Sequence, residues 1–346
     1  MVKCLKIKKE FGGKAINFLK KKDWLDTTTM VGRSAQRYLL LPLTKKFKEK
    51  ELLKNFPDSS IVIRALQKFP VQTGTLKDLL KGVIPEKHIE EVIGRFDTIG
   101  DVAIINIPKK LQRLEKSIAW TLKRAHPQIK VIAKKGSVVK GKFRKRKLTI
   151  LAGEKRTTTS CTEAGVKMNM DLAKVYFSPR LAHERQRIAL QVKANEKVLV
   201  MFAGIGPFAL AIAKKQPKSK IWAIELNPDA VKYMEENIRL NRFSNITAIK
   251  GDVIIEVPKL KEKFNRIIAV LPKTGFDFLD LILKTASKNT IIHFYSILHE
   301  NDLKDGIEKI KKAAKKQKKK VKILKKIKAG SYGPAIWRWC IDFKIQ

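Results

Sequence analysis

The feature that most constrains the fold of this chain is a regular series of apolar segments, separated by helical stretches, that begins near residue 173. The segments are KVLVMFAG, KIWAIEL, ITAIKGD, RIIAVLP and TIIHFYS. Strands that are apolar on both faces belong to a parallel sheet covered by helices on both sides. After a lysine-rich helix come two more strand-like segments, VKILKKIKA and AIWRWCIDFKI, which can pair antiparallel at the sheet edge. This α/β pattern predicts a class I, Rossmann-like methyltransferase sheet rather than a six-stranded dinucleotide-binding sheet.

Two smaller units precede this sheet. Residues 1–64 alternate strand and helix patterns and predict an N-terminal α/β domain. A connector rich in Pro and Gly is expected near 65–74. Residues 75–172 mix helices and strands and predict a middle α+β domain, so that the methyltransferase domain spans 173–346. A chain of 346 residues is long enough for three separate cores.

The charge of the chain is its compositional anomaly. There are 75 Lys and Arg against 32 Asp and Glu, a formal net charge of +43. Such a charge opposes compaction, and a polyanion such as nucleic acid is the partner that would offset it. Lysine enrichment through adaptation to heat is the alternative, but it normally adds Glu alongside Lys. The basic run at 140–147, KGKFRKRK, is expected in a loop, where a charge run by itself indicates only a solvated edge.

Cysteine usage and the N-terminus predict a cytoplasmic protein. Cys4, Cys161 and Cys340 show no CxxC or Cys/His ligand spacing, so neither a metal site nor a disulfide is expected. The start, MVKCLKIKKEF, lacks the apolar core of a signal peptide, and no apolar run reaches the roughly 18 residues of a membrane span. No membrane partner is therefore expected.

A glycine turn indicates a cofactor site. The first apolar strand runs into Phe202-Ala203-Gly204-Ile205-Gly206-Pro207 and then into a helix. Glycines at such a junction let the backbone turn sharply beneath a ligand at the helix N-terminus. NAD-binding folds use a similar turn, but here the third glycine is absent and Pro207 occupies the turn. The pattern favours S-adenosylmethionine over NAD as the cofactor.

Acidic residues after the next two strands support the same cofactor. Glu225, followed by Leu226, ends the second strand, where a carboxylate can accept both ribose hydroxyls. Asp252, followed by Val253, ends the third strand and is expected near the adenine amino group. The predicted cofactor-binding residues therefore include Phe202, Gly204, Gly206, Glu225, Leu226, Asp252 and Val253.

At this point the chain resembles the archaeal and eukaryotic type of tRNA guanine-37 N1-methyltransferase, including wyosine-pathway methyltransferases on the same scaffold. The resemblance spans essentially the whole chain and is carried by CLKIKK, FDTIGDVAIINIP, KGKFRKR followed by LAGE, KVYFSPRLAHERQRI, MFAGIGPF and SYGP…IDFKI. It implies three domains, with an N-terminal unit that contacts the tRNA elbow and a catalytic sheet that receives the anticodon loop. We expect a monomer.

The resemblance also implies roles for individual residues. Glu184 matches the general base that takes a proton from the target purine, and Arg144 matches the arginine that steadies charge on the purine oxygen. Arg185 matches a residue near the cofactor, and Tyr176 one near the target base. Ser178-Pro179 has the signature of a helix start. The alternative for Glu184 is a simple ion pair at helical spacing with Arg180 or Arg187.

The departures from the family pattern bear on the acceptor. Val200 and Glu225 stand where the family has acidic and Asp residues, and Val270-Leu271-Pro272 stands where it has Asn-Leu-Pro. Val270 and Pro272 are assigned to the target base. Because Val270 offers no partner to a guanine edge, we expect the tricyclic 4-demethylwyosine, methylated at carbon 7, to fit better. N1-methylation of guanosine 37, alone or as a second activity, stays open, as does a catalytically inactive tRNA-binding protein.

The charge generates the first testable prediction. If tRNA binding is dominated by phosphate contacts, log affinity should fall linearly with log salt concentration, with a slope of about −0.9 per neutralised phosphate on duplex regions. Filter binding of tRNA between low and high salt measures this slope. A flat response would show that the excess of Lys and Arg serves another purpose.

Overall fold

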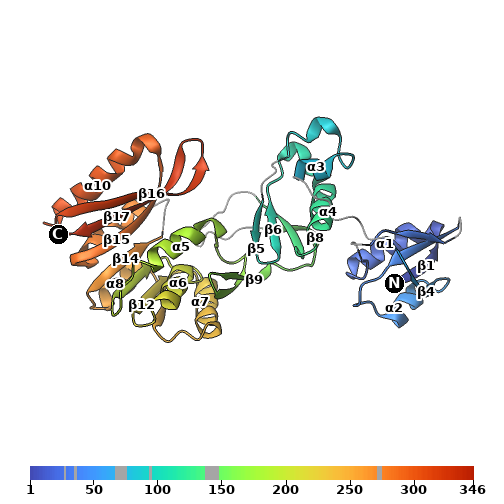
Figure 1. The fold of residues 1–346 in the computed structure, drawn as a ribbon, viewed down its shortest axis with the longest axis horizontal. Helices are drawn as coiled ribbons and strands as arrows, with labels where there is room; N and C mark the ends of the chain where they lie inside the picture. The colour runs from blue at the N-terminus through green and yellow to red at the C-terminus, as the bar shows by residue number, and fades with distance from the viewer. Residues whose placement is uncertain (27–28, 35–36, 67–75, 93–95, 137–147, 271–274) are drawn as a thin grey trace. The chain divides into compact units, whose positions relative to one another are not determined.

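The computed structural model describes residues 1–26, 29–34, 37–66, 76–92, 96–136, 148–270 and 275–346. These residues divide into two compact units. The helices and strands of both units are labelled in Figure 1. One unit comprises residues 1–135 and 148–156, and the other comprises residues 157–346. The division by sequence into domains at 1–64, 75–172 and 173–346 remains a prediction.

The N-terminal sheet of the first unit has four antiparallel strands. Its order is β2-β3-β1-β4, with bounds Gly32–Ser34, Tyr38–Pro42, Val2–Lys8 and Ser60–Arg64. Helices α1 (Gly12–Lys21) and α2 (Glu49–Asn55) accompany it. Leu5, Leu19, Leu41 and Leu52 form its core together with Trp24. Strand β4 ends at Arg64, directly before the connector expected near 65–74.

A second sheet in the same unit has a core of its own. Its order is β5-β6-β7-β8, with bounds Asp97–Ile99, Val102–Ile105, Val131–Lys135 and Leu148–Gly153. Parallel β6 and β7 are joined through α4 (Glu115–Ala125), and α3 spans Leu76–Leu80. The apolar pattern of EKHIEEVIGRF, residues 86–96, predicts a helix, and this prediction is wrong: its described residues form a 3-10 turn at Glu86–His88 and further turns. So short a segment gains little from helical hydrogen bonds alone, and its Ile89 and Val92 are buried without a helix.

The sheet of the second unit is the one that the apolar segments predict. Its order is β13-β12-β11-β14-β15-β17-β16, and the strands from β13 to β15 are parallel whereas β17 and β16 are antiparallel. In chain order the bounds are Lys197–Met201 (β11), Lys220–Glu225 (β12), Ile246–Lys250 (β13), Phe264–Ala269 (β14), Ala286–His299 (β15), Val321–Gly333 (β16) and Ile336–Ile345 (β17). The predicted class I methyltransferase fold is confirmed.

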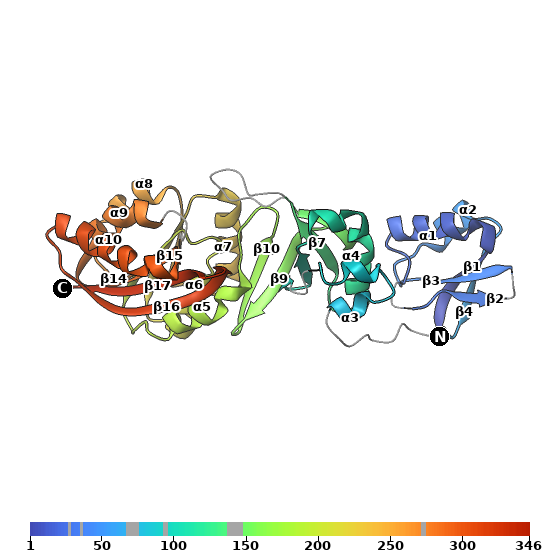
Figure 2. The same cartoon turned by 90° about the horizontal axis from the view of Figure 1, so that it is seen from above.

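Helices cover both faces of this sheet, as fully apolar strands require (Figure 2). One apolar cluster includes residues of α5 (Ala182–Ala189), α6 (Pro207–Lys215) and α7 (Pro228–Leu240). The other includes residues of α8 (Val253–Lys259), α9 (Leu279–Thr285) and α10 (Leu303–Lys316). None of the helices in the described residues has the length and apolar character to cross a membrane.

A hairpin at the start of the second unit is fixed to α7. It consists of β9 (Thr158–Glu163) and β10 (Val166–Asp171). The backbone N–H groups of Lys167 and Asn169 donate to the side-chain oxygens of Asn241 and Asn237, at 2.9 and 2.7 Å. The hairpin is thus held by the methyltransferase unit.

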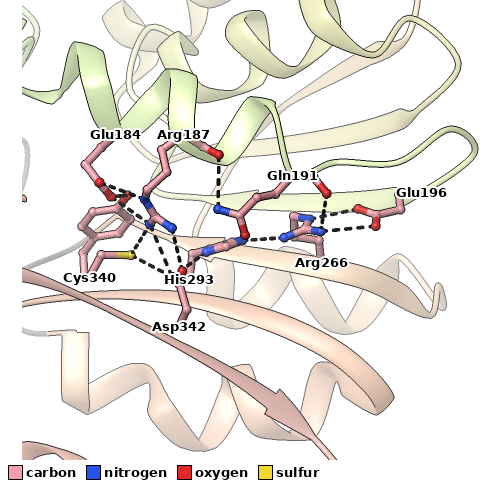
Figure 3. A network of polar contacts seen from close by, with 9 residues as sticks. Glu184, Arg187, Gln191, Glu196, Arg266, His293, Cys340 and Asp342 are labelled. Atoms are coloured by element: carbon pink, nitrogen blue, oxygen red, sulfur yellow. Dashed lines mark hydrogen bonds and ion pairs between the residues drawn. The ribbon is translucent and has the colours of Figure 1, made fainter. Parts of the chain in front are cut away.

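A chain of buried polar groups links three neighbouring strands of the sheet (Figure 3). Arg266 of β14, 2% exposed, donates to Glu196 at 2.9 Å and to Nε2 of His293 at 2.7 Å. Because a guanidinium can only donate, Nε2 of His293 accepts and Nδ1 carries the ring proton. Nδ1 of His293, on β15, lies 2.6 Å from Asp342 of β17 and donates to it. Every polar group in this chain therefore has a partner.

These buried hydrogen bonds generate a prediction about the stability of the protein in acid. Burial lowers the pKa of His293 below its ordinary value of 6.5, so the imidazole binds a proton less readily in the folded protein than in the unfolded one. The unfolded state binds a proton near pH 6.5, and the free energy of unfolding should therefore fall as the pH drops below that value. The loss from one group is at most about 1.4 kcal/mol per pH unit.

Urea unfolding at pH 7.5 and pH 5.0 measures this loss. In the His293→Gln variant the dependence between these pH values should shrink. The matched control is His183→Gln, which changes an exposed histidine of α5. Asp342 has its pKa lowered to about 2, with hydrogen bonds from His293 and Arg187 opposing the effect of burial, so its contribution is lost only at lower pH. An unchanged pH dependence in His293→Gln would contradict the prediction.

Candidate active site

The carboxyl ends of four parallel strands bring most of the predicted cofactor residues to one edge of the sheet. β11 ends before Phe202, β12 ends at Glu225, β13 ends two residues before Asp252, and β14 ends before Val270. In an open α/β sheet, ligands bind in the crevice outside these carboxyl ends. Residues spread over the chain are therefore neighbours because of the order of the strands.

The glycine turn adopts the conformation that its sequence predicts. Gly204 and Gly206 have φ angles of +58° and +84°, and Phe202 has +60°. A side chain at Gly206 would lie 2.9 Å from Cγ of Met234, so only glycine fits there. Phe202 is a non-glycine residue in this strained region and packs edge-on against Phe278. The turn ends at Gly206, and α6 begins at Pro207.

Glu225 holds the turn and its own loop together. One carboxylate oxygen accepts the backbone N–H of Gly204 and the other accepts that of Asn227, both at 2.8 Å. The side chain of Asn227 then caps α7 by accepting from the backbone of Asp229. Leu226, between them, is partly exposed. The carboxylate is thus fixed at the tip of β12 with lone pairs left for further donors.

Asp252 and Val253 lie at the corresponding place after β13. Asp252 caps α8, and its carboxylate accepts the backbone N–H of Ile254 at 3.1 Å. Val253 is 3% exposed and belongs to the core beneath the helix start. The predicted pair therefore presents one acidic and one apolar group at the same edge as Glu225.

A pocket opens beside the glycine turn. Among the predicted residues it brings together Tyr176, Arg185, Phe202, Gly204 and Val270. Its other lining residues are Phe177, Ser178, Leu181, Ala203, Pro207, Phe208, Tyr332 and Arg338. Glu184, Glu225 and Asp252 are not among the lining residues. Arg144 and Pro272 lie outside the described residues.

Tyr332 and Arg338 were missed by sequence reasoning. The motif SYGP indicates a turn between two strands, but nothing local in it indicates which part of the sheet the turn approaches. In the structure Nη2 of Arg338 donates to the hydroxyl of Tyr176 at 3.2 Å, across 162 residues of sequence.

Arg185 fixes the entry to α5. It is 1% exposed, and its Nε and Nη2 donate to the two carboxylate oxygens of Glu163 at 2.6 and 2.5 Å. Nη2 also donates to the carbonyl of Ser178 at 3.2 Å. A 3-10 turn begins at Pro179 and leads into α5, as predicted, but the side chain of Ser178 makes no capping hydrogen bond. Instead, Arg185 connects the start of this helix, at the carbonyl of Ser178, to Glu163 of the β9–β10 hairpin.

Glu184 is buried on α5, with 7% of its surface exposed. Arg187 donates to both of its oxygens at 2.9 Å, and the hydroxyl of Tyr295 donates to Oε2 at 2.9 Å. Arg187 also donates to Asp342 at 2.6 Å, so Glu184 is connected to the buried chain described above (Figure 3). Burial raises the pKa of Tyr295 well above its ordinary value, which keeps the hydroxyl a donor. The ion pair with Arg187 is real, and it fixes the orientation of the carboxylate.

His293, Cys340 and Asp342 form a trio of potential metal ligands among the described residues, with ligand atoms within 4.8 Å of one another. A metal requires a thiolate and an imidazole nitrogen without its proton. Here Nδ1 of His293 donates its proton to Asp342, and burial raises the pKa of the Cys340 thiol. Two guanidinium groups, of Arg187 and Arg266, also contact the trio. The arrangement is a hydrogen-bonded cluster rather than a cation site.

Comparison with known proteins identifies two family matches. Residues 159–324 match the TRM5/TYW2 methyltransferase domain, and residues 76–157 match the TYW2 N-terminal domain. The tRNA (guanine(37)-N(1))-methyltransferase Trm5b of Pyrococcus abyssi is 34% identical over 93% of this chain and 92% of its own length. The tRNA 4-demethylwyosine(37)-methyltransferase Taw21 of Saccharolobus solfataricus is 33% identical over 67% of this chain and 87% of its own length.

Solved structures agree with these relatives. The structure of aTrm5 in complex with tRNALeu is 32% identical, covers 99% of both chains and superposes with a TM-score of 0.70. The Methanocaldococcus jannaschii TYW2 structure in complex with AdoMet is 26% identical, covers 73% of this chain and 99% of its own, and has a TM-score of 0.56. The resemblance found in the motifs is thereby confirmed, and so is S-adenosylmethionine as a cofactor of the family. The chain belongs to the TRM5/TYW2 family of S-adenosylmethionine-dependent tRNA methyltransferases.

Proposed function

We propose that this protein transfers the methyl group of S-adenosylmethionine to the purine at position 37 of tRNA. The observation that carries the proposal is the pocket in which Gly204 of the cofactor turn lies with Tyr176 and Val270, the residues assigned to the target base. A methyl donor and an acceptor must meet within a single pocket for direct transfer. The Trm5b and Taw21 relatives described above are both named for position 37 of tRNA.

The edge of the sheet supplies the contacts for the cofactor. Glu225 would accept the ribose hydroxyls, because each of its oxygens has a lone pair beyond the backbone N–H that it already binds. Asp252 and Val253 would flank the adenine, and Phe202 and Leu226 would pack beside the bound molecule. Gly204 and Gly206 leave room for the cofactor above the turn.

Glu184 would take the proton that the purine loses as the methyl group arrives. It follows Leu181 by one helical turn and directly precedes Arg185, and both of these line the pocket. Tyr295 and Arg187 hold the carboxylate by three hydrogen bonds, which keeps it in one orientation. Arg144 would stabilise negative charge on the purine oxygen.

A matched pair of variants tests the role of Glu184. Glu184→Gln should lower the rate of methyl transfer roughly 10²- to 10⁴-fold, which is typical of a lost general base. The control Asp171→Asn removes a buried carboxylate that accepts from Thr157 outside this network, and it should affect the rate much less. Single-turnover methyl transfer, with thermal unfolding of each variant, is the measurement. Equal losses in both variants would assign Glu184 to structure alone.

The acceptor atom depends on Val270. An apolar side chain in the pocket favours the tricyclic 4-demethylwyosine, whose acceptor is carbon 7, over guanine, whose polar edge would be left unpaired. N1 of guanosine 37 is the second candidate, because the relative that this chain matches over 93% of its length is named for that reaction. We favour carbon 7 of 4-demethylwyosine on the ground of the side chain at Val270.

The acceptor is tested with two forms of tRNA, one carrying guanosine and one carrying 4-demethylwyosine at position 37. The wild-type protein should methylate the tricyclic base faster, and Val270→Asn should shift relative kcat/KM toward guanosine by roughly 10- to 200-fold. Val270→Ala is the control, since it changes the volume of the pocket without adding a polar group. Products are identified by nucleoside mass spectrometry.

Each outcome of this test assigns a function. Methylation of guanosine alone by the wild type would make N1 the acceptor. The absence of product on both tRNA forms, together with no binding of S-adenosylmethionine in calorimetry, would favour the inactive tRNA-binding protein.

A further inference from the structure

The hairpin formed by β16 and β17 supplies two side chains to the pocket beside the glycine turn. Tyr332 lies near the end of β16 and Arg338 near the start of β17. Both line the pocket together with Tyr176, Gly204 and Val270. Neither residue has a role in the cofactor contacts or in proton transfer as described above.

Arg338 is a buried cation that lacks an anion. Its exposed fraction is 5%, and its Nε has no hydrogen-bond acceptor within the described part of the chain. Its Nη2 donates to the hydroxyl of Tyr176 at 3.2 Å. No ion pair of Arg338 with a carboxylate occurs among the described residues, which include every Asp and Glu of the sequence. Because a buried charge is unfavourable without a partner, an oxygen acceptor that enters the pocket would supply a contact that the described residues do not.

Tyr332 presents an aromatic ring at the same place. It is 49% exposed, and the guanidinium carbon of Arg338 lies 5.4 Å from the centre of its ring. Enzymes that modify a base within a loop hold the extruded base by stacking on aromatic side chains and by hydrogen bonds to its polar edge. The half-exposed ring of Tyr332 can provide the stacking surface, and the unsatisfied Nε of Arg338 can provide the hydrogen bond.

We propose that Tyr332 and Arg338 receive the target nucleotide, and this inference rests on the proposed function. The ring of Tyr332 stacks on the extruded purine, and Nε of Arg338 donates to an oxygen of the same nucleotide. That oxygen is either the carbonyl of the purine or the adjoining phosphate. The hairpin at the end of the chain thus recognises the nucleotide, whereas the glycine turn binds the cofactor.

The stacking is tested with tRNA that carries the fluorescent base 2-aminopurine at position 37. Binding to the wild-type protein in the presence of S-adenosylhomocysteine should change the emission, because the base leaves its stack and meets Tyr332. Tyr332→Ala should abolish the quenched component and weaken methyl transfer at subsaturating tRNA by about 5- to 150-fold, the range for one lost base–aromatic stack. Tyr332→Phe should retain both. Leu324→Ala, at an exposed apolar residue of the same hairpin, is the control.

The hydrogen bond is tested with Arg338→Gln and Arg338→Lys, and with Lys326→Gln as a control that removes an exposed charge from β16. Arg338→Gln should lower methyl transfer at least 10-fold more than the control does. 2-Aminopurine has no carbonyl at carbon 6, so affinity for the labelled tRNA separates the two acceptors. If Arg338→Gln binds the labelled tRNA more weakly than the wild-type protein does, the acceptor is the phosphate. If the two proteins bind the labelled tRNA equally, the acceptor is the carbonyl. Arg338→Lys keeps the charge and provides the measurement if the Gln variant does not fold.

Two results would overturn the inference while leaving the proposed function intact. One is a wild-type rate and emission in both Tyr332→Ala and Arg338→Gln. The other is a loss in Arg338→Gln that is explained by weaker binding of S-adenosylmethionine, which would assign Arg338 to the carboxylate of the cofactor. Failure of the wild-type protein to methylate any tRNA would instead contradict the proposed function, and the fluorescence change would then still test nucleotide capture.

Discussion

The carboxylate of Asp342 lies between Arg187 and His293, and this contact joins the helix that carries Glu184 to the interior of the sheet. Through His293 the connection continues to Arg266 and Glu196. An unbroken series of hydrogen bonds therefore runs from α5 across three strands. Removing one member of such a chain leaves a buried charge without a partner, at a cost of about 3–5 kcal/mol. In the folded protein these hydrogen bonds hold Arg187 against both Asp342 and Glu184.

The second unit separates two tasks along one edge of its sheet. Backbone geometry serves the cofactor: the left-handed glycines and the tips of β12 and β13 fix where a ligand can lie. The proposed contacts to the target nucleotide come instead from long side chains of other elements, namely Tyr176 before α5 and Arg338 from the terminal hairpin. Both of these side chains line the same pocket as Gly204.

The excess of Lys and Arg acts at longer range than the contacts in the pocket. Many lysines of α10 are exposed on the side of the helix that faces away from the apolar core around Ile310 and Ala314. Attraction to phosphates acts over distances near the Debye length of about 8–10 Å and carries little sequence information. Choice of the nucleotide therefore falls to short-range contacts in the pocket.

The sequence by itself determined the elements whose signals are local. Apolar segments of strand length predicted the parallel sheet, a pair of glycines predicted the turn after β11, and acidic residues directly after strands predicted the positions of Glu225 and Asp252. Each of these follows from hydrophobic burial or backbone sterics within a few residues. The ion pair of Glu184 with Arg187 was predictable from helical spacing, but only the tertiary structure decided the distant partners of Glu184 and Arg338, because Tyr295 and Tyr176 lie 111 and 162 residues away along the chain. The same holds for His293, whose partner Asp342 lies 49 residues further along the chain. Strand order brings such residues together, and the pairing of β15 with β17 depends on packing across the whole sheet.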